Sequence, residues 1–170
     1  MVTVFINGPA TSGKDTFMKM CKKACKGKAK TISLADKPKA ALSILGWNGE
    51  KTEEFRKLLS DLKILADEKF NMSNQYIQET MKVIEKRKNK PLILFVCARE
   101  IEDIKNCTTF LDGMGKKNVT LLIEREGVDP ILSNVADAQV RDYSYEFVIR
   151  NDGSLEELQE KASNFVKEIL

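Results

Sequence analysis

The chain has 170 residues, 42% hydrophobic and 31% charged, and its formal net charge is +3 because 28 Lys and Arg stand against 25 Asp and Glu. This composition is typical of a folded globular protein of about one domain and excludes an intrinsically disordered chain. Histidine is absent, which excludes a histidine-based catalytic triad, a three-histidine zinc site and an imidazole general base. The chemistry must therefore use Lys, Arg, carboxylates, hydroxyls, thiols or a bound ion.

The sequence carries no signal for a membrane or for secretion. No apolar run approaches the roughly 18 residues of a membrane span, and no basic segment with an apolar core opens the chain as in a signal peptide. We therefore expect a cytoplasmic protein with no membrane partner. The four cysteines, Cys21, Cys25, Cys97 and Cys107, form no C-x-x-C pair and are predicted to be reduced thiols. The net charge is too small to indicate nucleic acid as a partner, and the lysines of residues 22–30 are interpreted as a solvated helix end.

Strand and helix patterns alternate at the start of the chain. In order, the sequence predicts a buried strand at Val2–Ile6, a loop of small residues at 7–13, an amphipathic helix over 14–25 and a brief strand at 31–34. A second helix then runs to the turn at 46–49, with Asp36 as its predicted N-cap and Pro38 in its first turn.

Two helical patterns follow without a strand between them. The first covers 52–70, with the apolar stripe Phe55, Leu58, Leu59, Leu62 and Leu65, and the second covers 73–86. Because no strand separates them, residues 47–87 are predicted to form a helical insert that projects from the sheet as a lid or acceptor-binding segment.

Alternation returns in the second half of the chain. The prediction is a strand at 92–96, a helix over 100–110, a strand at 119–123, a short helix at 135–141, a strand at 147–149 and a last helix that Ser154 and Glu157 open as a capping box. The strand at 92–96 is wholly apolar, as expected when helices cover both faces of a sheet. The whole pattern predicts one α/β domain, a parallel sheet sandwiched by helices.

One motif carries the chemistry. Residues 8–14 fit the pattern G-x-x-x-x-G-K between the first strand and the first helix. Glycines let successive backbone N–H groups turn inward around an oxyanion, the helix presents its positive dipole end, and Lys14 adds a mobile cation. The predicted phosphate-binding residues are Gly8, Ala10, Thr11, Ser12, Gly13, Lys14, Asp15 and Thr16.

The position after the motif lysine differs from the common pattern, which has Ser or Thr as a magnesium ligand. Here it is Asp15, followed by Thr16. A carboxylate can hold Mg²⁺ through a water, because the ion keeps most of its hydration shell. Alternatively the hydroxyl of Thr16 or Ser12 serves. We predict Asp15 and Thr16 as the metal-binding residues.

This Gly-Lys-Asp loop resembles that of the phage-type deoxynucleoside monophosphate kinases and the related phosphomevalonate kinases. Further segments are similar in the same order: 33–38 to S-F-A-D-P, 45–47 and 54–59 to G-W followed by G-R-x-L-L, Arg99 to the arginine of D-x-R, and 151–155 to N-D-G-(S/T)-L. The resemblance implies a P-loop NTPase-type fold, ATP as phosphoryl donor, and Mg²⁺.

The resemblance also implies site residues. Asp36, Lys37, Arg56 and Arg99 would bind the phosphorylated acceptor, Lys14 and Arg99 would be catalytic, and Asn151, Asp152 and Gly153 would wrap the donor adenine. Alternatives remain open: Asp36 as a helix cap only, and Arg56 in a surface ion pair. Arg125 and Arg141 could reach the transferring phosphoryl group, but solvated positions are favoured for both.

One position departs from the resembling family. Cys97 occupies the place of its acidic residue, and a neutral thiol is a poor ligand for a hard cation. The expected function is an ATP-dependent phosphotransferase acting on a nucleoside or deoxynucleoside monophosphate. The alternatives are a kinase of the phosphomevalonate or dephospho-coenzyme A type, and a nucleotide-binding module with little turnover. The sequence leaves the oligomeric state open.

Overall fold

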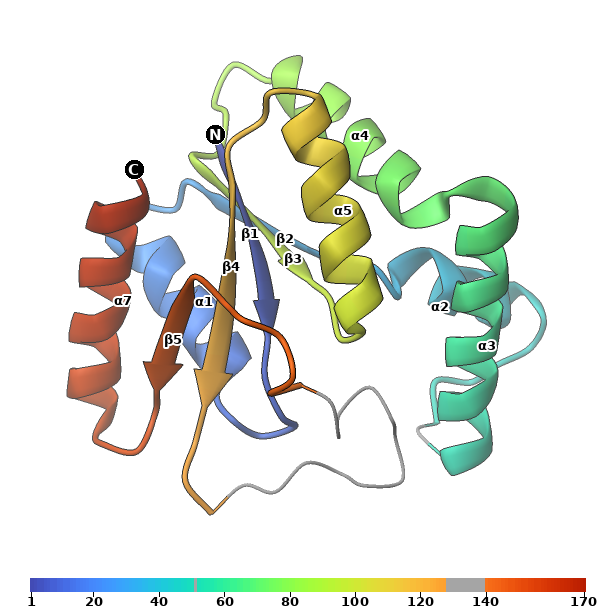
Figure 1. The fold of residues 1–170 in the computed structure, drawn as a ribbon, viewed down its shortest axis with the longest axis horizontal. Coiled ribbons are helices and arrows are strands. Elements are labelled where there is room, and N and C mark those ends of the chain that lie inside the picture. Colours follow the sequence, from blue (N-terminus) through green and yellow to red (C-terminus); the bar gives the residue numbers. More distant parts are fainter. Residues whose placement is uncertain (51, 128–139) are drawn as a thin grey trace. The chain divides into compact units, whose positions relative to one another are not determined.

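The computed structural model describes residues 1–50, 52–127 and 140–170, shown in Figure 1. These residues form two compact units, one made of Met1–Ile32 with Arg87–Leu170 and the other of Ser33–Lys86. No helix in the described part of the chain is long and apolar enough to cross a membrane.

A five-stranded sheet with the order β2-β3-β1-β4-β5 organises the first unit. Its strands are β1 (Val2–Asn7), β2 (Ala29–Ser33), β3 (Ile93–Cys97), β4 (Asn118–Glu124) and β5 (Phe147–Arg150). β1 pairs in parallel with β3 and β4, and β4 pairs in parallel with β5. The five predicted strands are confirmed, although β2 begins two residues before its predicted start at Thr31.

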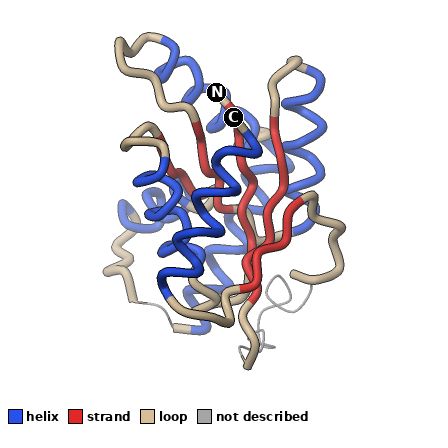
Figure 2. Tube along the Cα trace, turned by 90° about the vertical axis from the view of Figure 1, so that its left-hand side faces the viewer, coloured by secondary structure: helices blue, strands red, loops and turns tan. Residues whose placement is uncertain are grey.

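Helices cover both faces of this sheet, as Figures 1 and 2 show. On one face, α1 (Lys14–Ala24) and α7 (Leu155–Ile169) pack together, and the rings of Phe17 and Phe165 have centroids 5.7 Å apart. On the other face, α5 (Ile101–Gly113) buries Ile104, Cys107 and Leu111. The four residues 93–96 of β3 are fully buried. The predicted α/β fold, with a parallel sheet between helices, is confirmed.

The second unit consists of α2 (Asp36–Ile44), α3 (Glu53–Phe70) and α4 (Met72–Glu85). The predicted insert over 47–87 overlaps this unit, which begins earlier, at Ser33. The side chain of Thr52 caps α3 by accepting the N–H of Phe55, and Asn71 has a positive φ of 50° where α3 passes into α4.

The helix that the apolar stripe predicts over 52–70 is confirmed as α3, but its stripe is only partly covered: Phe55, Leu59 and Leu62 are half-buried. Leu58 and Leu65 are 47% and 52% exposed, whereas Lys63 is only 4% exposed. The Lys63 ammonium pairs with Asp67 at 3.2 Å, and this carboxylate also accepts the N–H and hydroxyl of Ser73. A buried charge is tolerated when it is paired and hydrogen-bonded in this way, so the buried residue of α3 is a charged one that the spacing of apolar residues does not indicate.

Asp36 is not the N-cap of α2, which is Ala35. The Asp36 carboxylate instead accepts the N–H of Ser33 at 2.8 Å and the hydroxyl of Tyr76 at 3.2 Å, so it joins two segments of the second unit.

The helix predicted at 135–141 falls almost entirely on residues outside the described part of the chain. All four cysteines are free thiols, as expected.

Candidate functional site

The loop between β1 and α1 requires glycine at both ends of the motif. Gly8 has a φ of 149° and Gly13 a φ of 97°, where other L-residues are strained. A Cβ atom on Gly8 would overlap the carbonyl oxygen of Ile123, and one on Gly13 would overlap the side-chain amide nitrogen of Asn151. The backbone therefore makes a tight concave turn with no room for side chains at these two points.

Lys14, the first residue of α1, folds back over this turn. Its ammonium donates to the carbonyl oxygen of Gly8 and, at 2.7 Å, to that of Pro9. The Ser12 N–H also donates to the Pro9 carbonyl, at 3.3 Å. The loop thus combines the amino end of a helix with a cation held at its opening, which is the arrangement that binds polyphosphate.

Asn7 is a site residue that sequence reasoning missed. It ends β1 and is 2% exposed. Its side-chain oxygen accepts the Gly8 N–H at 2.8 Å, and its amide nitrogen donates to the carbonyl of Arg99 and to the hydroxyl of Tyr145, both at 2.9 Å. Burial raises the pKa of Tyr145 to about 12, so this hydroxyl stays neutral at physiological pH. The one sequence signal was a polar residue closing an apolar strand.

The turn at 151–153, between β5 and α7, supports the loop from the other side. The Asn151 side chain donates to the Ser12 carbonyl at 2.9 Å, and the Asn151 backbone N–H donates to the backbone carbonyl of Glu124 at 2.8 Å. The Asp152 carboxylate accepts the N–H of Glu126 at 2.5 Å. This turn therefore joins the phosphate loop to the carboxyl end of β4, a contact that the expected adenine-wrapping role did not include.

A cavity of about 420 Å³ opens beside the loop. Its lining residues are Thr11, Gly13, Lys14, Asp15, Thr16, Arg125, Asn151, Gly153, Leu155 and Leu158. Arg125, whose predicted position is a solvated one with the phosphoryl group as the alternative, borders this cavity. Leu155 and Leu158 of α7 also line it and were not predicted as site residues. A polar loop beside aliphatic side chains suits a ligand with a charged polyphosphate and a flat apolar group.

The donor chemistry next to the loop fits a magnesium ion. Asp15, in the first turn of α1, and Thr16 both border the cavity and supply a carboxylate and a hydroxyl, hard oxygen donors of the kind Mg²⁺ takes. No group of three or more His, Cys, Asp or Glu side chains among the described residues could hold a metal. Mg²⁺ needs few protein ligands when substrate phosphates supply the others.

Cys97 does not add to this donor set. It ends β3, and its Sγ lies 4.0 Å from the Sδ of Met18, so the thiol contacts α1. Arg99 follows two residues later, is exposed, and is tied to Asn7 through its backbone carbonyl. Arg141 forms an ion pair with Glu124 at 3.3 Å.

The expected acceptor residues Asp36, Lys37 and Arg56 belong to the second unit. Lys37 pairs with Glu79 at 2.6 Å and lies 5.3 Å from the centre of the Tyr76 ring. Arg56 is exposed in the first turn of α3. Their role toward an acceptor stays a prediction.

No protein-family model and no curated protein matches the chain. Among solved structures, the APS kinase of Mycobacterium tuberculosis is 12% identical with a TM-score of 0.54 and is matched over 97% of this chain and 96% of its own. A dephospho-CoA kinase from Campylobacter jejuni is 18% identical with a TM-score of 0.52, over 98% and 96%. A putative kinase from Chloroflexus aurantiacus is 15% identical with a TM-score of 0.56, over 99% and 98%. The chain has the α/β fold of these kinases.

Proposed function

Starting from this shared fold, we propose that the protein transfers the γ-phosphoryl group of ATP to a small phosphorylated acceptor, with a nucleoside or deoxynucleoside monophosphate preferred. The observation that carries the proposal is the turn at residues 8–14: two positions without room for a Cβ, a helix amino end, and the Lys14 ammonium folded over the opening. The APS kinase that is similar in fold has a structure in complex with AMPPNP and APS, which supports nucleotide use.

In such a phosphoryl transfer the protein contributes mainly by positioning the reacting groups and by stabilising the charge of the transition state. Loop amides and Lys14 would hold the donor phosphates, and Arg99 would neutralise charge on the transferring group with its planar guanidinium. Mg²⁺, held by Asp15 and Thr16, would neutralise further phosphate charge when bound. An acceptor phosphate is already nucleophilic at neutral pH, so the transfer needs no strong general base. A chain without histidine can therefore catalyse it.

The cavity beside the loop would take the nucleoside of the donor. Leu155 and Leu158 offer apolar contact for a base, and the turn at 151–153 offers backbone groups for its edge. Arg125 would lie along the ribose or phosphates. This assignment agrees with the resemblance of the Asn-Asp-Gly segment to the family's adenine-binding turn.

The acceptor assignment depends on the second unit, where Asp36, Lys37 and Arg56 would bind the monophosphate. Two alternatives have support. The similarity in fold to a dephospho-CoA kinase favours an acceptor of that type. The thiol of Cys97, turned toward Met18, favours a nucleotide-binding module with little turnover.

The test is release of ADP from ATP and Mg²⁺ in the presence of single acceptors: the nucleoside and deoxynucleoside monophosphates, phosphomevalonate and dephospho-coenzyme A. We expect turnover with at least one monophosphate. Turnover with another acceptor alone would move the assignment to that class. Calorimetric binding of ATP without turnover on any acceptor would leave the binding module, and absence of ATP binding would overturn the proposal.

We expect Asp15→Asn to raise the Mg²⁺ concentration needed for half-maximal turnover by about tenfold, because losing a carboxylate that holds the ion through a bound water commonly costs 10- to 100-fold in metal affinity. Titration of Mg²⁺ at saturating ATP measures this, and Asp61→Asn, which changes an exposed carboxylate of α3, is the matched control. If Cys97→Asp raised turnover while Asp15→Asn had no effect, the ligand set proposed for the ion would be incorrect.

A further inference from the structure

Positive charge gathers at the edge of the sheet opposite the phosphate loop. The turns that precede the strands at this edge are connected to one another by backbone hydrogen bonds. The N–H groups of Leu92 and Ile93 donate to the carbonyl of Lys28 at 2.7 and 3.3 Å, and the N–H of Thr3 donates to that of Lys117 at 3.1 Å. The turns that precede β2, β3 and β4 therefore meet at the amino ends of the parallel strands, all within the first unit.

These turns are rich in cationic side chains. We call the following ten residues the cationic edge: Lys22, Lys23, Lys26, Lys28, Lys30, Arg87, Lys88, Lys90, Lys116 and Lys117. Most are exposed, and within the residues that the structure describes, Lys26, Lys28 and Lys88 form no ion pair. No carboxylate side chain lies in the sequence between Asp15 and Asp36.

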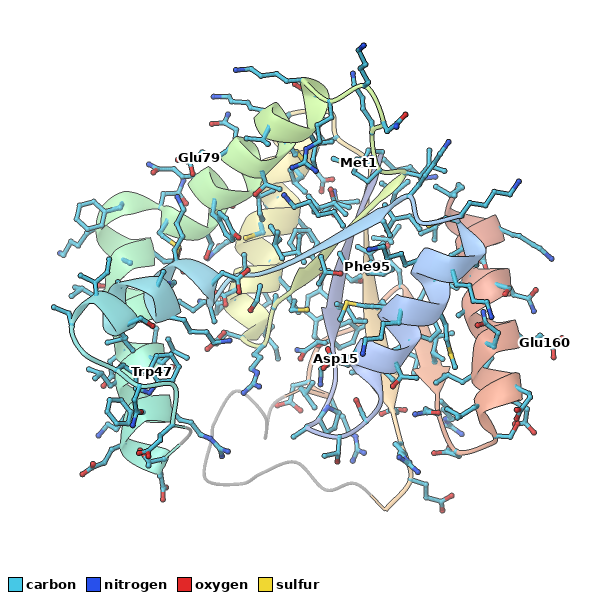
Figure 3. The ribbon with its side chains drawn as sticks, turned by 180° about the vertical axis from the view of Figure 1, so that it is seen from behind. Met1, Asp15, Trp47, Glu79, Phe95 and Glu160 are labelled. Carbon is cyan, nitrogen blue, oxygen red and sulfur yellow. The ribbon has the colours of Figure 1, made fainter. Side chains whose placement is uncertain are left out.

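The net charge of +3 conceals this segregation, because it sums over the chain. The other 18 of the 28 Lys and Arg and nearly all of the 25 Asp and Glu belong to the rest of the chain. Asp112 is a carboxylate next to the cationic edge, where it accepts the side-chain amide of Asn118 at 2.7 Å at the start of β4. In Figure 3, Met1 and Asp15 mark opposite ends of the sheet, and nitrogen-tipped side chains gather at the Met1 end. A ligand at the cationic edge would therefore leave the phosphate loop open.

We propose that the cationic edge binds the phosphate backbone of nucleic acid. Four neighbouring strands about 4.8 Å apart span about 14 Å. Duplex DNA carries one charge per about 1.7 Å of axis when both strands are counted, so about eight phosphate charges lie along a duplex of that length and roughly half of them face one side. Nine of the ten cations are lysines, compact point charges that neutralise phosphates without reading base edges. The binding is therefore independent of sequence and sensitive to salt.

Two other polyanionic partners suit this edge less well. Binding to an anionic bilayer by a basic cluster is strong when an apolar helix face or a second anchor accompanies the charge. Here the cations come mainly from turns. The exposed apolar residues at this end lie in turns or at the ends of the chain and form no helix face: Met1, Leu92, Met114 and Leu170. A protein interface has an apolar centre, which these turns do not supply.

The experiment measures fluorescence anisotropy of a labelled 20-base-pair DNA of arbitrary sequence between 50 and 200 mM salt. With about five phosphate contacts, affinity should fall about 500-fold over this range. The triple variant Lys26→Gln, Lys28→Gln, Lys88→Gln should weaken binding at 50 mM salt at least 30-fold and flatten the salt dependence. The matched variant Lys19→Gln, Lys105→Gln, Lys161→Gln removes equal charge from α1, α5 and α7 and should bind as the wild type does.

Three outcomes would overturn the inference: no DNA binding by the wild type at 50 mM salt, equal losses in the two triple variants, or tighter binding to phosphatidylserine vesicles that the Lys26, Lys28, Lys88 variant abolishes. Thermal unfolding of all variants checks that they fold. The ten residues lie outside the proposed active site, so phosphoryl transfer should persist in the variants. A failure here is thus distinguishable from a failure of the proposed kinase function.

Discussion

Lys14→Ala should lower kcat by about a thousandfold, because it removes the cation that would follow the charge of the transferring phosphoryl group, and such electrostatic contributions are worth about 10²- to 10³-fold. The Lys14 ammonium already lies over the loop, donating to the carbonyls of Gly8 and Pro9. Donor phosphates would replace these carbonyls as its partners. Steady-state turnover and calorimetric ATP affinity, measured together, separate an effect on transfer from an effect on binding.

Lys19→Ala is the control for this substitution. Lys19 is an exposed lysine of the same helix, about one and a half turns from Lys14, and its substitution removes the same charge. Its kcat and ATP affinity should remain at wild-type values. Unchanged turnover in Lys14→Ala, with the acceptor that the wild type uses, would remove the loop from the mechanism.

The strands and the phosphate loop could be predicted because their signals are local. An apolar run such as Ile93–Val96 indicates a strand buried on both faces, and the G-x-x-x-x-G-K pattern places its glycines where the backbone leaves no room for a Cβ. The N-cap half of the predicted capping box is confirmed, since the Ser154 side chain accepts the N–H of Glu157. Each of these features depends on residues close together in the sequence.

The missed features depend on partners distant in sequence. Asn7 is important because Arg99 and Tyr145 arrive next to it from other strand ends, and nothing near Asn7 in the sequence indicates them. The burial of Lys63 in α3 was not predicted because it depends on the ion pair with Asp67, which allows a charged residue to be interior. Periodicity counts apolar residues and does not detect such pairing.

Gly8→Ala should abolish ATP binding or prevent folding of the first unit, because the new Cβ would meet the carbonyl oxygen of Ile123, a backbone atom of β4 that cannot move aside as a side chain can. Moving β4 or the loop would also disturb the Gly8 N–H that Asn7 holds. Calorimetry with ATP and thermal unfolding together detect both consequences.

Gly113→Ala isolates this steric cause, since the same methyl group is added at the end of α5 where nothing lies within 4 Å. Alanine is favoured over glycine in a helix by up to about 1 kcal/mol, so this variant should be as stable as the wild type or slightly more stable, and should bind ATP normally. If Gly8→Ala bound ATP as well as Gly113→Ala does, the loop would tolerate a side chain at its first glycine. The close approach to β4 would then not be what shapes the phosphate site.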